Sequence, residues 1–332
     1  MGLNWLVSGG CGFIGRNLVS ALLEADASAN IRIYDNLSVG SSQELDAICD
    51  YQLVKAADVV KAPVGVELVI ADILDGDSFK SAATGIDVVV HLAANTGVGP
   101  SVENPLLDCH ANVNGIVNAL EAARHHQISK FVFASSGAPV GEVMPPIHEE
   151  IVPHPVSPYG ASKLAGEGYC SAYFHCFGID TVALRFGNVY GPLSGKKESV
   201  VAKFINRTMK GEILEIYGDG TQTRDFIYVK DLVNAIEKAA TVDGIGGNVF
   251  QIATSRETTL LELAEALTSV LRSNGLDVPD VVHAEKRVGD VQRNFSDTTK
   301  AKDILGWQAT TDLAEGLDAT VRYFQDSINQ AQ

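Results

Sequence analysis

The sequence predicts an α/β fold, namely a doubly wound parallel sheet (a Rossmann fold) with a smaller α+β substrate-binding cap. Short apolar, β-branched runs alternate with helical patterns through the first half of the chain. A glycine-rich turn follows the first run, and the alternation stops near residue 186. Near-continuous apolar runs are typical of parallel strands that helices cover on both faces, and such sheets bind ligands at the carboxyl ends of their strands.

The expected elements follow one another in βαβ order. Strands are expected at residues 4–8, 31–35, 67–71, 87–92, 130–134 and 181–185, with helices at 15–25 and 109–126. Gly- and Pro-rich loops with amphipathic helices at 231–240 and 260–272 predict the cap, and a strand at 249–252 is expected to return to the sheet. We therefore expect one domain over 1–178, with a return near 228–255, and a second over 179–332.

Composition excludes several classes of partner. The 332 residues carry 25 Lys and Arg against 41 Asp and Glu, a net charge of −16, which argues against nucleic acid or an anionic membrane as the partner. No apolar run approaches the ~18 residues of a membrane span. The five cysteines include no C-x-x-C pair, which favours free thiols and a cytoplasmic location. No metal site is expected, since Val152 stands where H-E-x-x-H needs its second histidine.

The first expected strand runs into a glycine motif that opens a helix. Gly9, Gly12 and Gly15 allow a tight turn and the close approach of a pyrophosphate to the helix N-terminus. The second strand ends in Asp35, 20 residues after Gly15, where a carboxylate accepts hydrogen bonds from ribose hydroxyls and repels a 2′-phosphate. Together these residues predict binding of NAD rather than NADP. A purely structural turn and a capping aspartate are the alternative interpretation.

Two segments carry groups suited to proton transfer. Tyr159 and Lys163 are spaced i,i+4, so they share one helix face, and a cation beside the phenol is expected to lower the tyrosine pKa toward neutrality. Ser135 and Ser136 end the strand expected at 130–134, at the edge where chemistry belongs in this fold. Taken alone, Tyr159 and Lys163 are better explained as part of an ordinary helix start. Ser135 and Ser136 alone are also compatible with a strand end that has no catalytic function.

As a set, these motifs resemble the extended short-chain dehydrogenase/reductase family. The chain carries SGGCGFIG, YDNLS, ADI, HLAA, FVFASS, PYGASK, LRFGNVYGP, YGDGTQTRDFIYV and RVGD in the order of that family. The resemblance covers nearly the whole chain. Within the family it is strongest to the NAD-dependent nucleotide-sugar epimerases, of the UDP-glucose 4-epimerase type.

The resemblance implies a role for each matching residue. The catalytic trio would be Ser136, Tyr159 and Lys163, with Ser136 preferred to Ser135 because it stands five residues before Gly141. The cofactor contacts would be Gly9, Gly12, Phe13, Ile14, Gly15, Asp35, Asn36, Asp72, Ile73, Leu92, Ala93, Ala94 and Asn112, with Tyr159 and Lys163. The substrate contacts would be Ser136, Asn188, Arg224, Arg287, Asp290 and Asn294. One departure is Pro139-Val140, which replaces the Val-Tyr of the family and alters the wall of the sugar site.

The implied activity is reversible C4 epimerisation of a UDP-hexose through a 4-keto intermediate with bound NAD. In the epimerases that the chain resembles, a tyrosine at the position of Asn294 limits the site to plain hexoses, so the smaller Asn294 implies that N-acetylated sugars are accepted too. The alternative is that Asn294 points to solvent and another side chain sets the limit. A homodimer through the helices at 109–126 and 159–177 is also implied. Two alternatives stay open: a 4,6-dehydratase and a non-catalytic NAD sensor. The residues after Ser136, Gly137 and Ala138, disfavour the dehydratase, because neither side chain can transfer a proton.

Overall fold

The protein is built on an eight-stranded sheet, seen in a computed structural model that describes residues 2–197, 199–285 and 291–331. All neighbouring strands are parallel, in the order β12-β7-β6-β5-β1-β2-β4-β3. The strands are β1 (Asn4–Ser8), β2 (Asn30–Asp35), β3 (Gln52–Leu53), β4 (Val66–Ile70), β5 (Val88–His91), β6 (Lys130–Ser136), β7 (Asp180–Phe186) and β12 (Asn248–Ile252). Because the chain leaves β1 toward β2 and later returns on the other side as β5, a crevice is expected at the carboxyl ends of these strands. The predicted fold class is confirmed.

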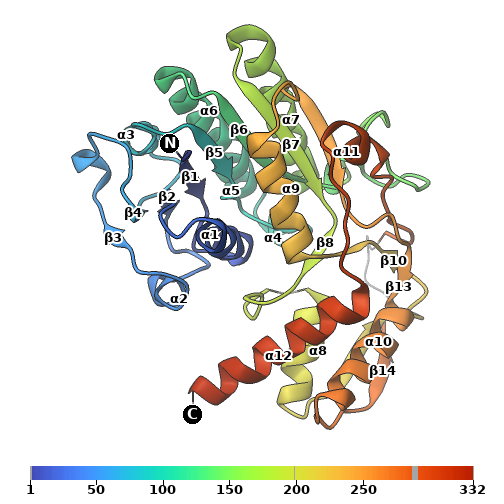
Figure 1. The fold of residues 1–332 in the computed structure, drawn as a ribbon. Helices are drawn as coiled ribbons and strands as arrows, with labels where there is room; N and C mark the ends of the chain where they lie inside the picture. Colours follow the sequence, from blue (N-terminus) through green and yellow to red (C-terminus); the bar gives the residue numbers. More distant parts are fainter. Residues whose placement is uncertain (1, 198, 286–290, 332) are drawn as a thin grey trace.

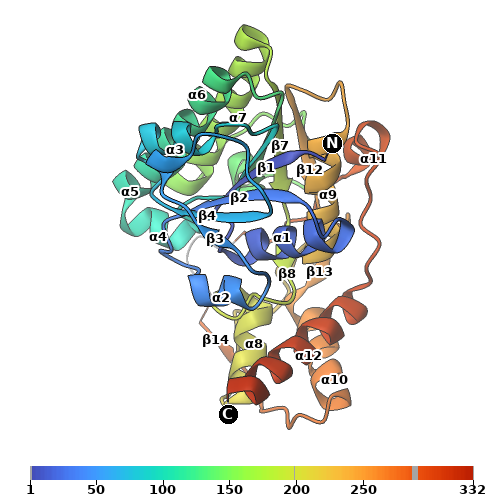
Figure 2. The same cartoon turned by 60° about the vertical axis from the view of Figure 1, so that its left-hand side comes forward.

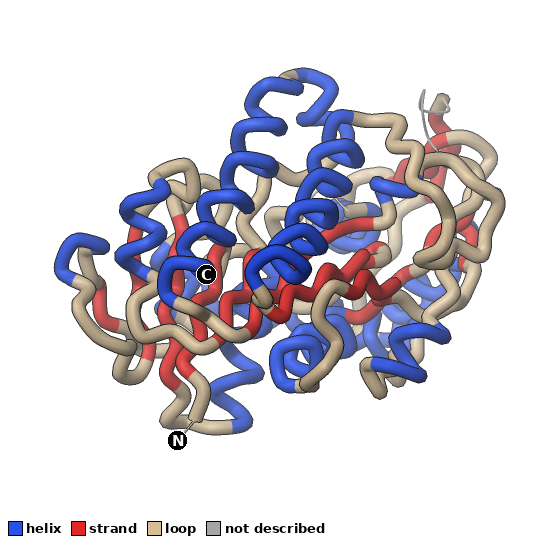
Figure 3. Tube along the Cα trace, turned by 90° about the horizontal axis from the view of Figure 1, so that it is seen from above, coloured by secondary structure: helices blue, strands red, loops and turns tan. Residues whose placement is uncertain are grey.

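The sheet buries both of its faces. Along β1, Trp5 and Val7 belong to one cluster of buried side chains and Leu6 to another, as the two-residue period of a strand requires. Helices α3, α6 and α7 supply the Leu6 face, and α1 and α9 supply the opposite face, so helices lie on both sides of the strands (Figures 2 and 3). These helices are α1 (Phe13–Ala25), α3 (Gly76–Ala82), α6 (Gly115–His126), α7 (Pro158–Phe177) and α9 (Val229–Thr241).

The single helix expected at 109–126 is divided in the structure by a π-helical turn and begins earlier in the chain. It is preceded by α4 (Val98–Glu103) and consists of α5 (Pro105–Cys109), a π-helical turn at His110–Asn114 and α6. A π turn inserts an extra residue into the helix and is common near functional sites. The smaller elements between the strands are α2 (Ser42–Asp46) and the 3₁₀ turns Ala56–Asp58 and Ala138–Val140.

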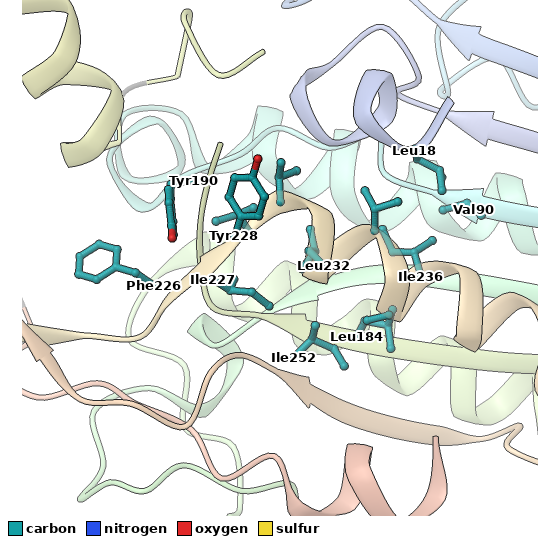
Figure 4. Packing of buried hydrophobic residues seen from close by; sticks show 14 of the residues in the cluster. Leu18, Val90, Leu184, Tyr190, Phe226, Ile227, Tyr228, Leu232, Ile236 and Ile252 are labelled. Atoms are coloured by element: carbon teal, nitrogen blue, oxygen red, sulfur yellow. The ribbon is translucent and has the colours of Figure 1, made fainter. Parts of the chain in front are cut away.

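The second half of the chain adds a lobe below the sheet (Figure 1). Its helices are α8 (Val200–Met209), α10 (Leu260–Ser273) and α12 (Leu313–Ala331), and its strands are β8 (Asn188–Tyr190), β9 (Leu214–Tyr217), β10 (Thr223–Arg224), β11 (Phe226–Tyr228), β13 (Thr258–Thr259) and β14 (Val281–Ala284). The short helix α11 (Thr299–Ile304) lies instead beside the edge strand β12 of the sheet (Figure 1). The strands form three two-stranded sheets, β8 with β11, β9 with β14 and β10 with β13. Buried side chains run without a break from Leu18 and Val90 to Tyr190 and Phe226 (Figure 4), so the lobe shares a core with the sheet.

The chain crosses between the two parts several times. It leaves the sheet after β7 and returns as β12, which pairs with β7 at the edge of the sheet, as expected for residues 249–252. The division into domains at residue 178 stays a prediction. None of the helices in the described ranges is long and apolar enough to cross a membrane.

Candidate active site

The turn after β1 has a shape that only glycine permits. Gly9 has a φ of +73°, and a Cβ there would lie 2.7 Å from the backbone nitrogen of Ala93. A Cβ on Gly15 would lie 2.4 Å from the carbonyl oxygen of Gly9, while the Gly12 N–H donates to that same oxygen at 3.1 Å. The turn therefore packs directly against the chain after β5, which brings the predicted Leu92, Ala93 and Ala94 beside the glycines.

The start of α1 leaves main-chain donors for a ligand. Gly12 is the N-cap, and no side chain in the described structure caps the first turn, which begins with Phe13 and Ile14. Uncapped N–H groups at a helix start bind phosphate well, because they add to the positive end of the helix dipole. The glycine turn exposes its main chain, and the helix that follows it starts without a cap. Both features suit the binding of the pyrophosphate of a dinucleotide.

Acidic and amide groups gather at the ends of β2 and β4. Asp35 is buried, and its carboxylate accepts hydrogen bonds from the N–H groups of Cys11 and Leu37 at 2.9 and 2.8 Å. Burial raises the pKa of Asp35, and the two N–H donors oppose that shift. Asn36 donates to the Asp72 carboxylate at 2.9 Å, and Ile73 is buried beside it. The residues expected around adenosine thus lie together at one edge of the sheet.

Helix α7 positions the predicted tyrosine and lysine. It starts with Pro158, and the Ser157 side chain caps it by accepting from the Gly160 N–H at 3.1 Å. Lys163, buried one turn after Tyr159, donates from Nζ to the Ala134 carbonyl of β6 at 2.8 Å. Ser136 follows two residues later and hydrogen-bonds the Tyr159 hydroxyl. The structure therefore brings the three predicted catalytic residues together at the carboxyl end of β6.

The predicted acidity of Tyr159 is wrong for this arrangement. Burial raises the pKa of Tyr159 to about 12, and the Asp108 charge raises it further, while the hydrogen bond with Ser136 lowers it. Lys163 does not produce the expected lowering, because its Nζ is directed at the Ala134 carbonyl and lies 5.8 Å from the centroid of the tyrosine ring. Burial also lowers the pKa of Lys163 to about 8, so this lysine loses its proton, and with it its positive charge, at a lower pH than a surface lysine does.

Asn112 lies in the π turn and ties three segments together. Its Oδ1 accepts from the Asn95 N–H at 2.8 Å, and its Nδ2 donates to Asn95 O, Asp108 Oδ1 and Ser162 Oγ at 2.9 to 3.1 Å. The side chain therefore holds the loop after β5 against α7. Its predicted contact with the cofactor stays a prediction.

A buried ion pair behind the trio was not predicted from the sequence. The Glu167 carboxylate accepts from Arg185 Nε and Nη2 at 2.8 and 2.7 Å and from Ser135 Oγ at 2.6 Å. Glu167 stands one turn after Lys163 on α7, so this spacing could have indicated it. The contact locks α7 to β6 and β7, and it gives Ser135 a structural partner, which agrees with the choice of Ser136 as the reacting serine.

The loop after β8 packs on the start of α1, a contact that sequence reasoning missed. Arg16 donates to Leu193 O at 3.0 Å, and Lys196 forms an ion pair with Glu44 at 2.7 Å. Lys197 Nζ lies 5.2 Å from the ring centroid of Phe13, and burial lowers its pKa to about 8. The second half of the chain thereby reaches over the glycine turn.

Four of the predicted substrate residues lie in the described part of the chain, and Asn188 pairs with Phe226, two residues after Arg224. Ser136 is in register with Phe186, so Asn188 follows two residues beyond the end of β7. Arg224 donates to Val291 O at 2.7 Å, and the Asn294 N–H donates to Thr223 Oγ1 at 3.3 Å. Arg287 and Asp290 lie outside the described residues. Within the described ranges, no group of three or more metal-ligating side chains is present.

Fold and site together define a class, namely Rossmann proteins with a Ser-Tyr-Lys site that bind a nicotinamide dinucleotide. The chain belongs to the NAD dependent epimerase/dehydratase family, whose family model matches residues 5–253. The cofactor of this family is NAD.

Full-length relatives and solved structures agree with this assignment. UDP-glucose 4-epimerase of Mycolicibacterium smegmatis is 36% identical over 97% of this chain and 98% of its own. The crystal structure of UDP-glucose 4-epimerase from Thermotoga maritima with UDP-glucose superposes with a TM-score of 0.86 at 34% identity, covering 98% of this chain and all of that one. UDP-N-acetylglucosamine 4-epimerase from Methanobrevibacter ruminantium, in complex with UDP-N-acetylmuramic acid, gives a TM-score of 0.86 at 32% identity, with 98% and 99% covered.

Proposed function

We propose that this chain catalyses the reversible inversion of C4 of a UDP-hexose, with NAD held at the glycine turn. The observation that carries the proposal is the meeting of Ser136, Tyr159 and Lys163 at the carboxyl end of β6, in a chain whose relatives are named as UDP-sugar 4-epimerases. NAD, when bound, accepts a hydride from the sugar carbon and returns it. All other steps belong to side chains of this protein.

Tyr159 takes the proton of the 4-hydroxyl group as the phenolate and later returns it. Because burial raises the pKa of Tyr159 to about 12, this role requires the positive charge of the nicotinamide, when NAD is bound, to favour the phenolate. Ser136 holds that proton through its hydrogen bond with the phenol, which is also the contact that favours the phenolate. Lys163 binds the nicotinamide ribose and fixes the end of β6 through the Ala134 carbonyl. Inversion requires the 4-keto sugar to present its other face, so the diphosphate must stay bound while the sugar turns.

We assign the substrate diphosphate to Arg224 and Arg287, together with Asn188 and Asp290, on the resemblance alone. Planar guanidinium groups pair well with phosphate oxygens, and they give a local positive site in an acidic protein. Asn294 is assigned to the sugar pocket. Its small size leads us to propose that UDP-N-acetylglucosamine and UDP-N-acetylgalactosamine are accepted beside UDP-glucose and UDP-galactose.

A panel of these four nucleotide sugars tests the proposal. Each is incubated with the purified protein, and inversion at C4 is followed by proton NMR. We expect interconversion within at least one pair, and a loss of about 100-fold or more in Tyr159→Phe with NAD still bound. No interconversion of any UDP-hexose despite bound NAD would refute the proposal and favour an NAD sensor.

The second candidate, a nucleotide-sugar 4,6-dehydratase, has support in the name of the family. That reaction needs an acid and a base next to the active-site hydroxyl. Here Gly137 and Ala138 follow Ser136, and no described atom lies within 4 Å of a Cβ placed on Gly137, so an acidic residue would fit and is absent. A stable 4-keto-6-deoxy product, detected by mass spectrometry, would reverse the choice.

We also propose a homodimer that forms through α6 and α7. Tyr169 and Phe177 on α7 are half exposed, and Tyr169 lines a shallow groove with Val113 and Val117 of the neighbouring helical segment. Exposed apolar side chains along a groove are typical of protein interfaces. All five cysteines are free, so we propose a reducing, cytoplasmic setting.

A further inference from the structure

Glu44 joins three segments that lie far apart in the sequence. It belongs to α2, where its Oε2 accepts from Lys196 Nζ at 2.7 Å and from Ser41 Oγ at 3.1 Å. Its Oε1 lies 3.4 Å from Arg16 Nη2 of α1. The carboxylate therefore lies between two cations, one on α1 and one on the loop at residues 191–197, which belongs to the second half of the chain.

The loop at 191–197 is also attached to α1 directly. Arg16 Nη2 donates to Leu193 O at 3.0 Å, and Asn17 Nδ2 of the same helix donates to Pro192 O at 3.1 Å. The Arg16 side chain is only 6% exposed, so water cannot replace these partners at low cost. The contact between loop and helix is therefore a set of hydrogen bonds around one buried guanidinium group.

The shape of this loop depends on contacts on both of its sides. Leu193 has a φ of +68°, a left-handed conformation that is unfavourable for leucine and persists only where the surroundings hold it. On the side of the lobe, Asn206 of α8 donates to Gly195 O at 3.0 Å. The loop is thus held between α8 of the lobe and α1 of the sheet.

The segments that Glu44 joins are the ones assigned to the cofactor. Helix α1 follows Gly12 with the first turn that suits a pyrophosphate, and α2 follows the end of β2, where Asp35 is assigned to the adenosine ribose. Figure 2 shows both helices on the side of the sheet that faces the lobe. Separation of α2 or of the loop from α1 would therefore open this end of the cofactor site.

We propose that Glu44 is a positioning residue that holds α2 and the loop at 191–197 against α1 and thereby slows the release of NAD. Slow release suits a reaction in which the hydride returns to the sugar, because one NAD then serves every turnover. In that respect the inference rests on the proposed function. Its physical content concerns only NAD, the cofactor of this family.

The test measures the release of NAD in the absence of any sugar. Protein that carries radiolabelled NAD is mixed with a large excess of unlabelled NAD, and the label left on the protein is counted over time after desalting. Wild type is compared with Glu44→Gln, Lys196→Met and the double variant. The matched controls remove exposed charges from the same two parts of the molecule, Glu24→Gln in the last turn of α1 and Lys210→Met at the end of α8.

We expect release to be about tenfold faster in Glu44→Gln, which loses both cations, about threefold faster in Lys196→Met, and within about twofold of wild type in the controls. The double variant should release NAD at the rate of Glu44→Gln alone, because the second change then removes no further contact. A rise in salt from about 0.05 to about 0.5 M should speed release more in wild type than in Glu44→Gln, since salt screens partly exposed charges.

Unchanged release in both single variants would overturn the proposal, and so would single effects that add up in the double variant. Lys196 is largely exposed, so Lys196→Met reports on the contact even if Glu44→Gln lowers the urea midpoint of unfolding. Since the measurement needs no sugar, a wild-type protein without turnover would refute the proposed function alone.

Discussion

Replacing Gly15 by alanine tests the shape of the glycine turn. The new Cβ would lie 2.4 Å from Gly9 O and 2.5 and 2.8 Å from Gly10 Cα and C, all backbone atoms that cannot move aside as a flexible side chain does. Ordinary carbon contacts begin near ~3.5 Å. Overpacking by one methyl group costs about 1–3 kcal/mol, and contacts this short belong at the upper end. Alanine gains about 1 kcal/mol over glycine inside a helix, so we expect a net loss of about 2 kcal/mol.

Gly12→Ala is the matched control in the same motif. Its Cβ would meet only Gly9 O, at 3.2 Å, so we expect the free energy of unfolding to change by less than about 1 kcal/mol. If the diphosphate approaches the backbone here, NAD binding should nevertheless weaken at least tenfold, or about 1.4 kcal/mol. The assays are urea unfolding without added NAD, followed by the fluorescence of Trp5 in β1 and Trp307, and NAD titration. Equal stability of the two variants would refute the reasoning on the turn.

Three further predictions concern the site and the assembly. Asn294→Tyr should reduce turnover of N-acetylated UDP-hexoses far more than that of plain ones, and equal losses in kcat/KM would show that this position does not limit substrate size. NAD binding should weaken as the pH rises through about 8, because burial lowers the pKa of Lys163 to about 8 and the neutral amine formed above that pH no longer offers a charge to the cofactor; an affinity that is unchanged from pH 7 to 9 would contradict this. Tyr169→Glu should convert a dimer into monomers in light scattering at micromolar concentration, whereas Glu103→Gln should not, and a dimer that persists in Tyr169→Glu would place the interface elsewhere.

The central sheet was predictable because its signals are local. Apolar runs, the glycine spacing and the acid after β2 each follow from a few neighbouring residues, and strands β1, β2 and β6 begin at or within one residue of their expected starts. The spacing of Tyr159 and Lys163 placed them on one face of a helix, and the family resemblance gave them a catalytic role. The return of β12 to the sheet was expected from one short apolar run.

Features that depend on distant partners could not be predicted. The π turn at His110–Asn114 leaves no mark in the apolar pattern, although it directs Asn112 toward Asn95 and Ser162. The strands β10 and β13 are two residues long and exist only because they meet each other. The high pKa of Tyr159 reflects burial by the completed fold, so the spacing of Tyr159 and Lys163 alone gave the wrong direction.

The central claim is that the hydrogen removed from C4 returns to the same sugar molecule on its other face. The most direct test incubates UDP-hexose carrying deuterium at C4 together with a ¹³C-labelled, deuterium-free UDP-hexose and no added NAD, then measures both products by mass spectrometry and NMR. The account predicts C4-inverted product that keeps its deuterium, with no deuterium in the ¹³C-labelled sugar. Loss of deuterium to water, exchange between the two sugars, or the absence of inversion would contradict it.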